Sequence, residues 1–367
     1  MKKSIIGVAI LILLIGIVVA YFKIIKKDNN TNMNDNTSSI EEKNEINTDK
    51  NIEKNKEENI NKNSINYTGW LKTSGKDLLN EHGEKIQLRG ISSHGIQWFP
   101  DVITFENLKE LRENWNINVF RIAMYTDPNA NGYIAHPEES KEFVRKIVDY
   151  AKKLDMYVII DWHILSDNNP QMYQNDAIKF FDEMSSEYRD TPNVIYEICN
   201  EPNGENVKWD ENVKPYAEEV IKTIRKNSPN ALVIVGTPNW CTDIESAINN
   251  PINESNIVYS CHFYAGTHKE DVRAKIDKAL EKNIPIFVSE CGITDASGNG
   301  AIYEESFNEW IEFLNNNNIS WVFWSFCNKA ESSSILRTEY KSNDEENSNI
   351  NDYLTRTGEI IKSLLKK

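Results

Sequence analysis

Short apolar segments recur along most of the chain, each separated from the next by a longer segment with polar positions. The apolar segments are rich in β-branched residues and end at polar or chain-turning residues, which is typical of buried strands in a parallel sheet. The sequence predicts such strands at 86–92, 118–124, 157–161, 193–198, 231–235, 257–261, 284–289 and 321–326.

The segments between these strands have helical periodicity. An apolar face with helical spacing runs from Phe143 to Leu154, another from Val272 to Leu280, and a last one from Leu354 to Leu365. Strands that alternate with helices in this way predict an α/β fold, a closed (β/α)8 TIM barrel. A doubly wound open sheet is the alternative, but no glycine-rich phosphate-binding turn follows any of the strands.

Two short stretches ahead of the first barrel strand predict a hairpin. Residues 78–80 and 85–88 flank a polar turn that contains Gly83. We expect this N-terminal hairpin to plug one end of the barrel.

The first part of the chain has a different pattern. An uncharged apolar run from Ile5 to Phe22 has lysines on both sides, so residues 1–27 are predicted to form a signal anchor or transmembrane segment. Cleavage as a signal peptide is the alternative, because Val18-Val19-Ala20 resembles a cleavage site. Residues 28–66 are rich in Asn, Glu and Lys without any period, and they are expected to be a disordered linker. Residues 67–367 then form one folded domain.

The net charge and the cysteine content argue against some partners and against some structural frameworks. The net charge is −15, with +5 on residues 1–27 and −4 on residues 28–66, so residues 67–367 carry −16. This balance argues against nucleic acid as a partner and favours a neutral substrate. The five cysteines are odd in number and lack CxxC spacing, so we expect small packing residues rather than a disulfide framework or a zinc knuckle.

Two glutamates stand directly after two of the buried strands. Glu201 follows the strand 193–198 within Asn-Glu-Pro, and Glu290 follows the strand 284–289. A buried carboxylate needs a partner or a chemical role, and a structural ion pair is the alternative for either residue alone. The carboxyl ends of barrel strands share one rim, so we expect the two glutamates to face one cleft.

Other strand ends add polar and aromatic side chains to the same rim. Two carboxylates flanking a bond can hydrolyse a glycoside, while aromatic rings and amide or imidazole groups suit the faces and hydroxyls of sugars. A zinc site of His94, His163 and His262 is the alternative, but it leaves the tryptophans and Asn-Glu unexplained, so no metal or other cofactor is expected. The additional rim residues are His94, Trp98, Arg121, Tyr125, Asp161, His163, Asn200, Trp240, His262, Tyr264, Trp324, Lys329 and Glu331.

Seven motifs in this order resemble glycoside hydrolase family 5, the cellulase family, and within it the bacterial endo-β-1,4-glucanase subfamily. The resemblance covers nearly all of residues 67–367. The motifs are SSHGIQW at 92–98, FRIAMY at 120–125, IIDWHILSD at 159–167, NEP at 200–202, HFY at 262–264, SE at 289–290 and WSF at 324–326.

The resemblance implies a retaining double displacement, with Glu201 as acid/base and Glu290 as nucleophile. It also implies that His262 and Tyr264 orient the two glutamates, with Tyr264 near the nucleophile. Arg121 would pair with Glu290.

The resemblance assigns the remaining rim residues to substrate contacts. Asn200 would bind the sugar 2-hydroxyl, His163 would line the cleavage subsite, and Trp324 would stack under a sugar, often ahead of a cis peptide bond. Trp240 would lie on the leaving-group side. The non-reducing side would be built by His94, Trp98, Tyr125, Lys329 and Glu331.

The resemblance implies an endoglucanase domain acting on cellulose or soluble β-glucan. We expect this domain to be monomeric and extracellular, either membrane-anchored or secreted after cleavage. Related β-glycanases that act on mannan, xylan or mixed-linkage glucan remain alternatives. A catalytically silent carbohydrate-binding relative is disfavoured because both glutamates are present, and a metal-dependent barrel hydrolase is a further alternative. One departure from the family is Cys291, where an aromatic residue usually follows the nucleophile.

Overall fold

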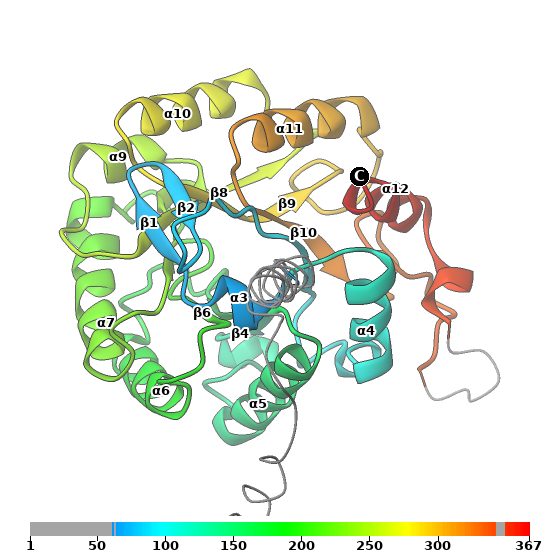
Figure 1. Cartoon of the computed structure of the whole chain (residues 1–367), viewed down its shortest axis with the longest axis horizontal. Coiled ribbons are helices and arrows are strands. Elements are labelled where there is room, and N and C mark those ends of the chain that lie inside the picture. The colour runs from blue at the N-terminus through cyan, green and yellow to red at the C-terminus, as the bar shows by residue number, and fades with distance from the viewer. Residues whose placement is uncertain (1–60, 62–63, 343–348) are drawn as a thin grey trace, which may run out of the picture. The chain divides into compact units, whose positions relative to one another are not determined.

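The computed structural model describes residues 61, 64–342 and 349–367 (Figure 1). The predicted anchor at 1–27 and nearly all of the predicted linker at 28–66 lie outside the described residues. Within the described part of the chain, every helix is too short or too polar to cross a bilayer.

Eight parallel strands close into a barrel in the order β10-β3-β4-β5-β6-β7-β8-β9. Each predicted strand is present, so the TIM-barrel prediction is confirmed. The strands are β3 (Arg89–Ser93), β4 (Val119–Tyr125), β5 (Tyr157–His163), β6 (Val194–Glu197), β7 (Val233–Val235), β8 (Ile257–Tyr264), β9 (Ile286–Gly292) and β10 (Trp321–Phe326).

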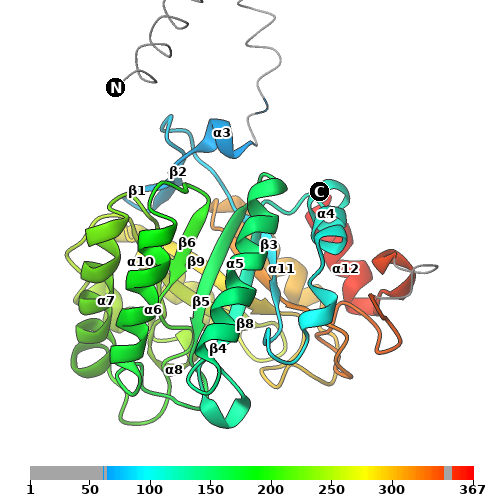
Figure 2. The ribbon, with the colours of Figure 1, turned by 90° about the horizontal axis from the view of Figure 1, so that it is seen from below.

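Helices that follow the strands cover the outside of the barrel (Figures 1 and 2). Each presents an apolar face to the strands, as in α5, where Val144, Ile147 and Ala151 are buried. The covering helices are α4 (Phe105–Asn114), α5 (Pro137–Lys153), α6 (Gln174–Glu187), α7 (Lys214–Asn227), α9 (Ile244–Asn249), α10 (Glu270–Glu281), α11 (Glu304–Asn316) and α12 (Arg356–Leu365).

The predicted N-terminal hairpin is present, and a strand pair that was not predicted precedes it. Strands β1 (Lys72–Ser74) and β2 (Asp77–Leu79) pair around Gly75, whose φ of +56° suits a tight turn. The predicted segments pair through a bridge between Leu79 and Lys85, with backbone hydrogen bonds from Asn80 N to Glu84 O and from Ile86 N to Leu78 O. The Asn80 side chain also holds the turn between them, because its Oδ1 accepts from the backbone N–H groups of residues 82 and 84.

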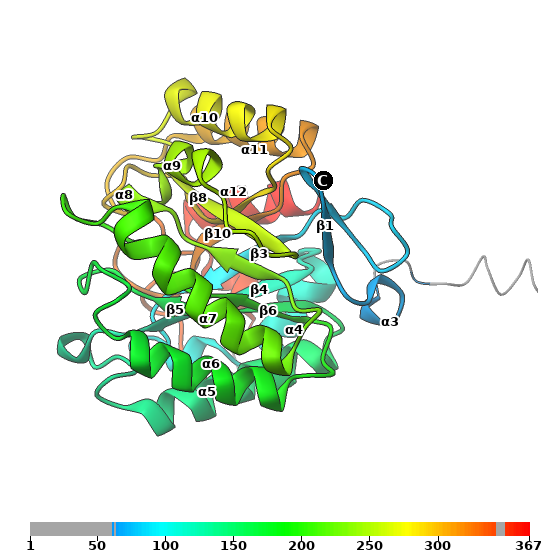
Figure 3. The ribbon, with the colours of Figure 1, turned by 90° about the vertical axis from the view of Figure 1, so that its left-hand side faces the viewer.

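The hairpin closes the amino end of the barrel, as expected of a plug (Figures 2 and 3). Leu71, Leu78 and Leu88 pack against the side chains inside the barrel, including Ile159 and Ile234. The short helix α3 (Ile65–Thr68) lies at the same end, where Tyr157 donates its hydroxyl to Gly69 O at 2.8 Å. The opposite, carboxyl end is therefore the end available for a site.

The outer core lies between the strands and the covering helices and contains large buried tryptophans. Trp115, Trp162, Trp209, Trp310 and Trp321 all belong to this layer, as packing residues rather than rim residues. The five cysteines are buried and free, which confirms that they pack rather than cross-link.

Candidate active site

A cleft of about 740 Å³ lies at the carboxyl ends of the barrel strands. Twelve of the fourteen predicted site residues line it, and the other two, Arg121 and Asn200, are buried beneath it. The lining residues among the predictions are His94, Trp98, Tyr125, His163, Glu201, Trp240, His262, Tyr264, Glu290, Trp324, Lys329 and Glu331.

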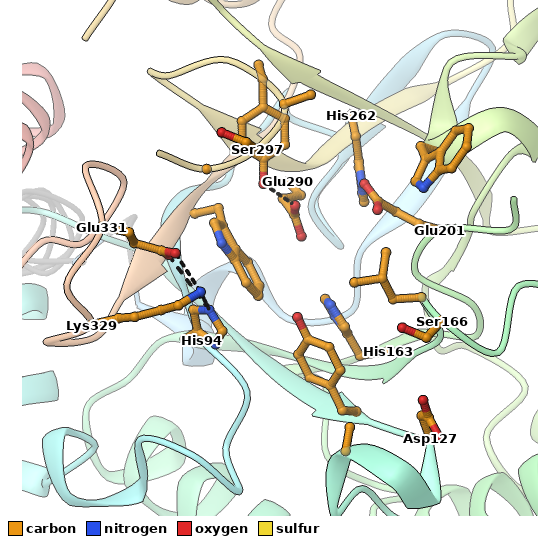
Figure 4. A pocket seen from close by; sticks show the side chains of 18 of the residues that line it. His94, Asp127, His163, Ser166, Glu201, His262, Glu290, Ser297, Lys329 and Glu331 are labelled. Carbon is orange, nitrogen blue, oxygen red and sulfur yellow. Dashed lines mark hydrogen bonds and ion pairs between the residues drawn. The ribbon is translucent and has the colours of Figure 1, made fainter. Parts of the chain in front are cut away.

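The two rim glutamates meet in this cleft. A carboxylate oxygen of Glu201 lies within 4.8 Å of one from Glu290, and Figure 4 shows both side chains directed into the same space. Retaining glycosidases hold their two carboxyl groups about 5–5.5 Å apart, so the separation suits a nucleophile and an acid acting on one bond.

Glu290 is held by two donors. Tyr264 donates its hydroxyl to Oε1 at 2.7 Å, and Arg121 Nη1 lies 3.1 Å from Oε2. Burial and the charge of Glu201 raise the pKa of Glu290, while His262 and the Arg121 guanidinium oppose this rise. Donation by Tyr264 and Arg121 stabilises the carboxylate form that a nucleophile needs.

Glu201 has a different neighbour. Its Oε1 lies 2.8 Å from Nδ1 of His262. Burial raises the pKa of Glu201 to about 7, opposed by Arg121 and reinforced by the charge of Glu197. A carboxyl that stays neutral near pH 7 is suited to donate a proton.

Arg121 lies under the cleft and ties four acidic or amide groups together. Besides Glu290, it contacts Glu197 through Nε at 2.7 Å, Asp161 at 3.0 Å and the Asn200 Oδ1 at 2.6 Å. The predicted pairing with Glu290 is present. Glu197 was missed as a site residue, although a single charge inside an apolar strand was a signal for it.

A hydrogen-bonded chain orients His163 and Asn200. Asp161 Oδ2 lies 2.6 Å from Nδ1 of His163, and Nε2 of the same ring lies 3.3 Å from the Asn200 amide nitrogen. Asp161 therefore holds the end of β5 in place through its contacts with Arg121 and His163, which is a structural role rather than a catalytic one. Burial raises its pKa to about 7, against the opposing Arg121 charge.

A charged group borders one side of the cleft. Lys329 Nζ lies 2.5 Å from Glu331 and 3.4 Å from His94 Nε2 (Figure 4). Burial lowers the pKa of His94 to about 3, so this ring is neutral and able to accept a hydrogen bond.

Aromatic rings supply the apolar surface of the cleft. Trp324 lies 5.4 Å from the His163 ring and nearly parallel to it, and the Trp324–Ser325 peptide bond is cis. Trp98 and Trp240 are 42% and 48% exposed, which is unusual for tryptophan. They follow β3 and β7, which stand on opposite sides of the closed barrel, so they lie across the cleft from one another.

The backbone that carries Trp240 is strained. Asn239, Trp240 and Cys241, in the short α8 (Pro238–Cys241), have φ values of 55°, 53° and 59°. Non-glycine residues adopt this left-handed conformation at an energetic cost, and such residues gather at functional sites.

Several cleft residues lie in irregular loops and were missed or left without a role. His268 is one of them, and its Nδ1 accepts from the backbone N–H of Tyr264 at 2.9 Å. No periodicity marks such positions in the sequence. The others with polar side chains are Asp127, Ser166, Asn239, Thr242 and Ser297.

The structure shows where Cys291 packs and which side chains lie close enough together to share a metal ion. Cys291 faces the outer core, with Sγ 3.3 Å from Val322 O, so its small size affects the layer behind the cleft rather than the cleft wall. Among the described residues, the side chains grouped closely enough to share a metal are Glu201, His262 and Glu290, a group without His94 or His163.

Comparison with known proteins decides the family. The family model described as cellulase (glycosyl hydrolase family 5) matches residues 79–330. The chain belongs to glycosyl hydrolase family 5. Two similar family members are an endoglucanase of Clostridium saccharobutylicum, 50% identical over 275 residues, and endoglucanase A of Evansella cellulosilytica, 50% identical over 254 residues. The matches cover 75% and 69% of this chain but 61% and 51% of those proteins, so the chain spans only part of their length.

Solved structures of family 5 share the barrel. Cellulase Cel5C_n superposes with a TM-score of 0.78 at 40% identity, covering 83% of this chain and 94% of that one. The catalytic domain of the Thermobifida fusca endoglucanase Cel5A gives 0.77 at 33% identity, over 83% and 99%. A variant of that Thermobifida domain was solved in complex with cellotetraose, at 32% identity and the same TM-score and coverage.

Proposed function

We propose that this chain hydrolyses internal β-1,4-glucosidic bonds of cellulose or soluble β-glucan with retention of configuration. In this proposal Glu290 is the nucleophile and Glu201 the acid/base. The observation that carries it is the pair of carboxyl groups within 4.8 Å in one cleft, each with a different set of partners. Cellotetraose bound to a variant of a related family 5 domain supports a β-1,4-glucan as the substrate.

The reaction proceeds in two displacements. A Glu290 oxygen attacks the anomeric carbon while the bond from that carbon to the leaving oxygen breaks, and the leaving oxygen takes the proton of Glu201. Water then attacks the anomeric carbon and gives its proton to Glu201, while the bond from that carbon to the Glu290 oxygen breaks and restores the Glu290 carboxylate. Arg121 and Tyr264 hold Glu290 for attack by their contacts at 3.1 and 2.7 Å.

The lining of the cleft matches a chain of sugars. The indole rings of Trp98, Trp240 and Trp324 offer apolar surfaces for sugar faces, and the Lys329–Glu331–His94 group offers polar contacts for hydroxyls. Asn200 lies beside the glutamates with its orientation fixed by Arg121 and is assigned to the 2-hydroxyl of the reacting sugar.

The test is a panel of substrates with the full chain. We expect reducing ends to appear, and viscosity to fall early, with carboxymethylcellulose and mixed-linkage or other soluble β-glucans. Glu290→Gln is the matched control, which should retain cello-oligosaccharide binding while turnover is lost. Full activity of this variant would refute the nucleophile assignment, and preference for mannan or xylan would move the chain to another β-glycanase specificity.

A chelator separates this proposal from a metal-dependent hydrolase. Hydrolysis by the double displacement should survive dialysis against a strong chelator, because two carboxyl groups and the solvent supply all the chemistry. Loss of activity that returns on adding a metal would refute the assignment.

We also propose that the catalytic domain acts outside the cell. The support is the apolar run with flanking lysines at 1–27, which fits a membrane anchor or a cleaved signal, and the size of a polymeric substrate. Fractionation of cells together with N-terminal sequencing of the mature protein tests it, since a soluble intracellular protein that retains Met1 would contradict it.

A further inference from the structure

A row of buried hydrogen bonds runs beneath the cleft from Arg121 to Glu201. Arg121 grips both carboxylate oxygens of Glu197, with Nε 2.7 Å from Oε2 and Nη2 3.2 Å from Oε1. Glu197 Oε1 lies 2.7 Å from the hydroxyl of Ser289. That hydroxyl lies 3.0 Å from Nε2 of His262, and the other nitrogen of the ring meets Glu201.

The ionisation of Glu197 follows from its surroundings. It is fully buried on β6, in a two-pronged ion pair with a guanidinium that remains protonated. Burial raises the pKa of Glu197, and this bidentate contact opposes the rise. We therefore treat Glu197 as a carboxylate, which accepts hydrogen bonds and donates none.

Ser289 has three polar neighbours and a single proton. Its Oγ lies 2.7 Å from Glu197 Oε1, 2.6 Å from the Ser260 hydroxyl and 3.0 Å from His262 Nε2. Because the Glu197 carboxylate can only accept, the Ser289 proton must go to it. Ser289 then satisfies its other two contacts as an acceptor, from the hydroxyl of Ser260 and from an N–H at His262 Nε2.

The position of the proton on the His262 ring determines whether Glu201 faces a lone pair or an N–H group. If Nε2 carries the proton of the neutral ring, Nδ1 presents a lone pair to Glu201 Oε1 at 2.8 Å. A carboxylate and a lone pair cannot form a hydrogen bond, so the contact requires a proton, held by Glu201 or by a doubly protonated His262. Burial lowers the pKa of His262 to about 4 and raises that of Glu201 to about 7, which assigns the proton to Glu201.

We propose that Glu197 is a positioning residue which, through Ser289, fixes His262 with its proton on Nε2, so that the Nδ1 lone pair holds the acidic proton on Glu201. This inference rests on the proposed function of Glu201 as acid/base. It explains two stages of the reaction together. Before bond cleavage the contact keeps Glu201 protonated, and after proton transfer the lone pair faces a carboxylate, which makes Glu201 a stronger base toward water.

The groups that face Glu201 come from several elements, and each bears on its titration. They are Glu197 on β6, Arg121 and Tyr125 on β4, Asp161 on β5, His262 and Tyr264 on β8, Glu290 on β9 and Cys241 on α8. A variant that changes only a neutral hydroxyl is therefore the cleanest test, because it leaves all of these groups in place.

Ser289→Ala removes the acceptor for His262 Nε2. The ring is then free to carry its proton on Nδ1 and to donate to an ionised Glu201. We expect the basic limb of the kcat/KM profile to move about one pH unit lower, and the rate at neutral pH on an unactivated cello-oligosaccharide to fall about tenfold. An aryl cellobioside with a good leaving group should lose much less. Ser260→Ala is the matched control, since it keeps the Ser289 hydroxyl and should leave the basic limb in place.

A second measurement observes the wild-type protein directly. ¹⁵N NMR of full-length protein labelled at histidine, with His262→Gln used to assign its signals, reports which ring nitrogen is protonated. We expect an unprotonated Nδ1 and a protonated Nε2 in the wild-type protein. A proton on Nδ1, or an unchanged basic limb in folded Ser289→Ala, would overturn the inference. A wild-type protein that cleaves no β-glucan would instead overturn the proposed function, and the NMR result would still decide the tautomer.

Discussion

At the scale of single residues, two identical side chains acquire different properties from their neighbours. Glu290 receives donors from Tyr264 and Arg121, which favour its charged form, whereas Glu201 faces the nitrogen of a neutral ring. Environments that separate two carboxyl groups in this way assign the nucleophile and the acid.

Replacement of the acid should depend on the leaving group. Glu201→Gln removes the transferable proton, so we expect kcat on cellotetraose to fall about a thousandfold, while an activated aryl glycoside loses far less in its first step. Steady-state and burst kinetics on both substrates measure this. Equal losses on the two substrates would contradict the proton-donor role.

The same variant should change how stability depends on pH. The pKa of Glu201 is raised in the folded state to about 7, so its contribution to stability is full below about pH 4 and is lost as the pH rises through 7. Glu201→Gln cannot ionise and should be more stable than the wild type at pH 8, by roughly 3 kcal/mol at most, but not at pH 4. Denaturant unfolding at the two pH values measures it, and an equal difference at both would refute the shift.

Trp324 is expected to act through its flat ring. Trp324→Ala should raise KM for cello-oligosaccharides by about tenfold, because a buried sugar face loses its aromatic partner. Trp324→Phe, which keeps an aromatic ring, is the control and should recover part of the affinity. An unchanged KM in the alanine variant would remove the stacking role.

At the scale of elements, the barrel strands could be predicted from the sequence, but a short strand pair and a contact between distant strands could not. The eight barrel strands were predicted because buried parallel strands are short apolar runs. The hairpin at 78–80 and 85–88 was predicted, but the preceding β1–β2 pair was missed, because each of its strands has only three residues and no apolar run marks them. Glu197 and Ser289 were missed as partners, since β6 and β9 are not adjacent and their contact exists only inside the closed barrel.

The hairpin should matter for stability but not for chemistry. Leu78 is buried against the inside of the barrel at the end opposite the cleft, so Leu78→Ala should cost about 2–4 kcal/mol of unfolding free energy. Leu79→Ala, on the less buried face of the same strand, is the control and should cost clearly less. Both variants should keep wild-type kcat at a temperature where they are folded, and a large loss of kcat in Leu78→Ala would contradict this separation.

At the scale of the whole molecule, the excess of acidic residues influences encounters with a polymer. Residues 67–367 carry a net charge of −16, which repels an anionic substrate over a distance that salt shortens. Raising the salt to about 0.2 M should lower KM for carboxymethylcellulose by about twofold or more. Neutral hydroxyethylcellulose is the control, and an equal salt effect on both polymers would show that the charge plays no part.

The closed amino end of the barrel has a consequence for access. Helix α3 and the hairpin lie at the amino end of the barrel (Figure 3), whereas Trp98, Trp240 and Trp324 line the cleft at the carboxyl end. The hairpin and α3 therefore lie at the end of the barrel opposite the cleft. A long polymer could lie across the cleft without contacting the hairpin. The hairpin end is therefore a suitable place to attach the domain to a carrier surface or a fusion partner.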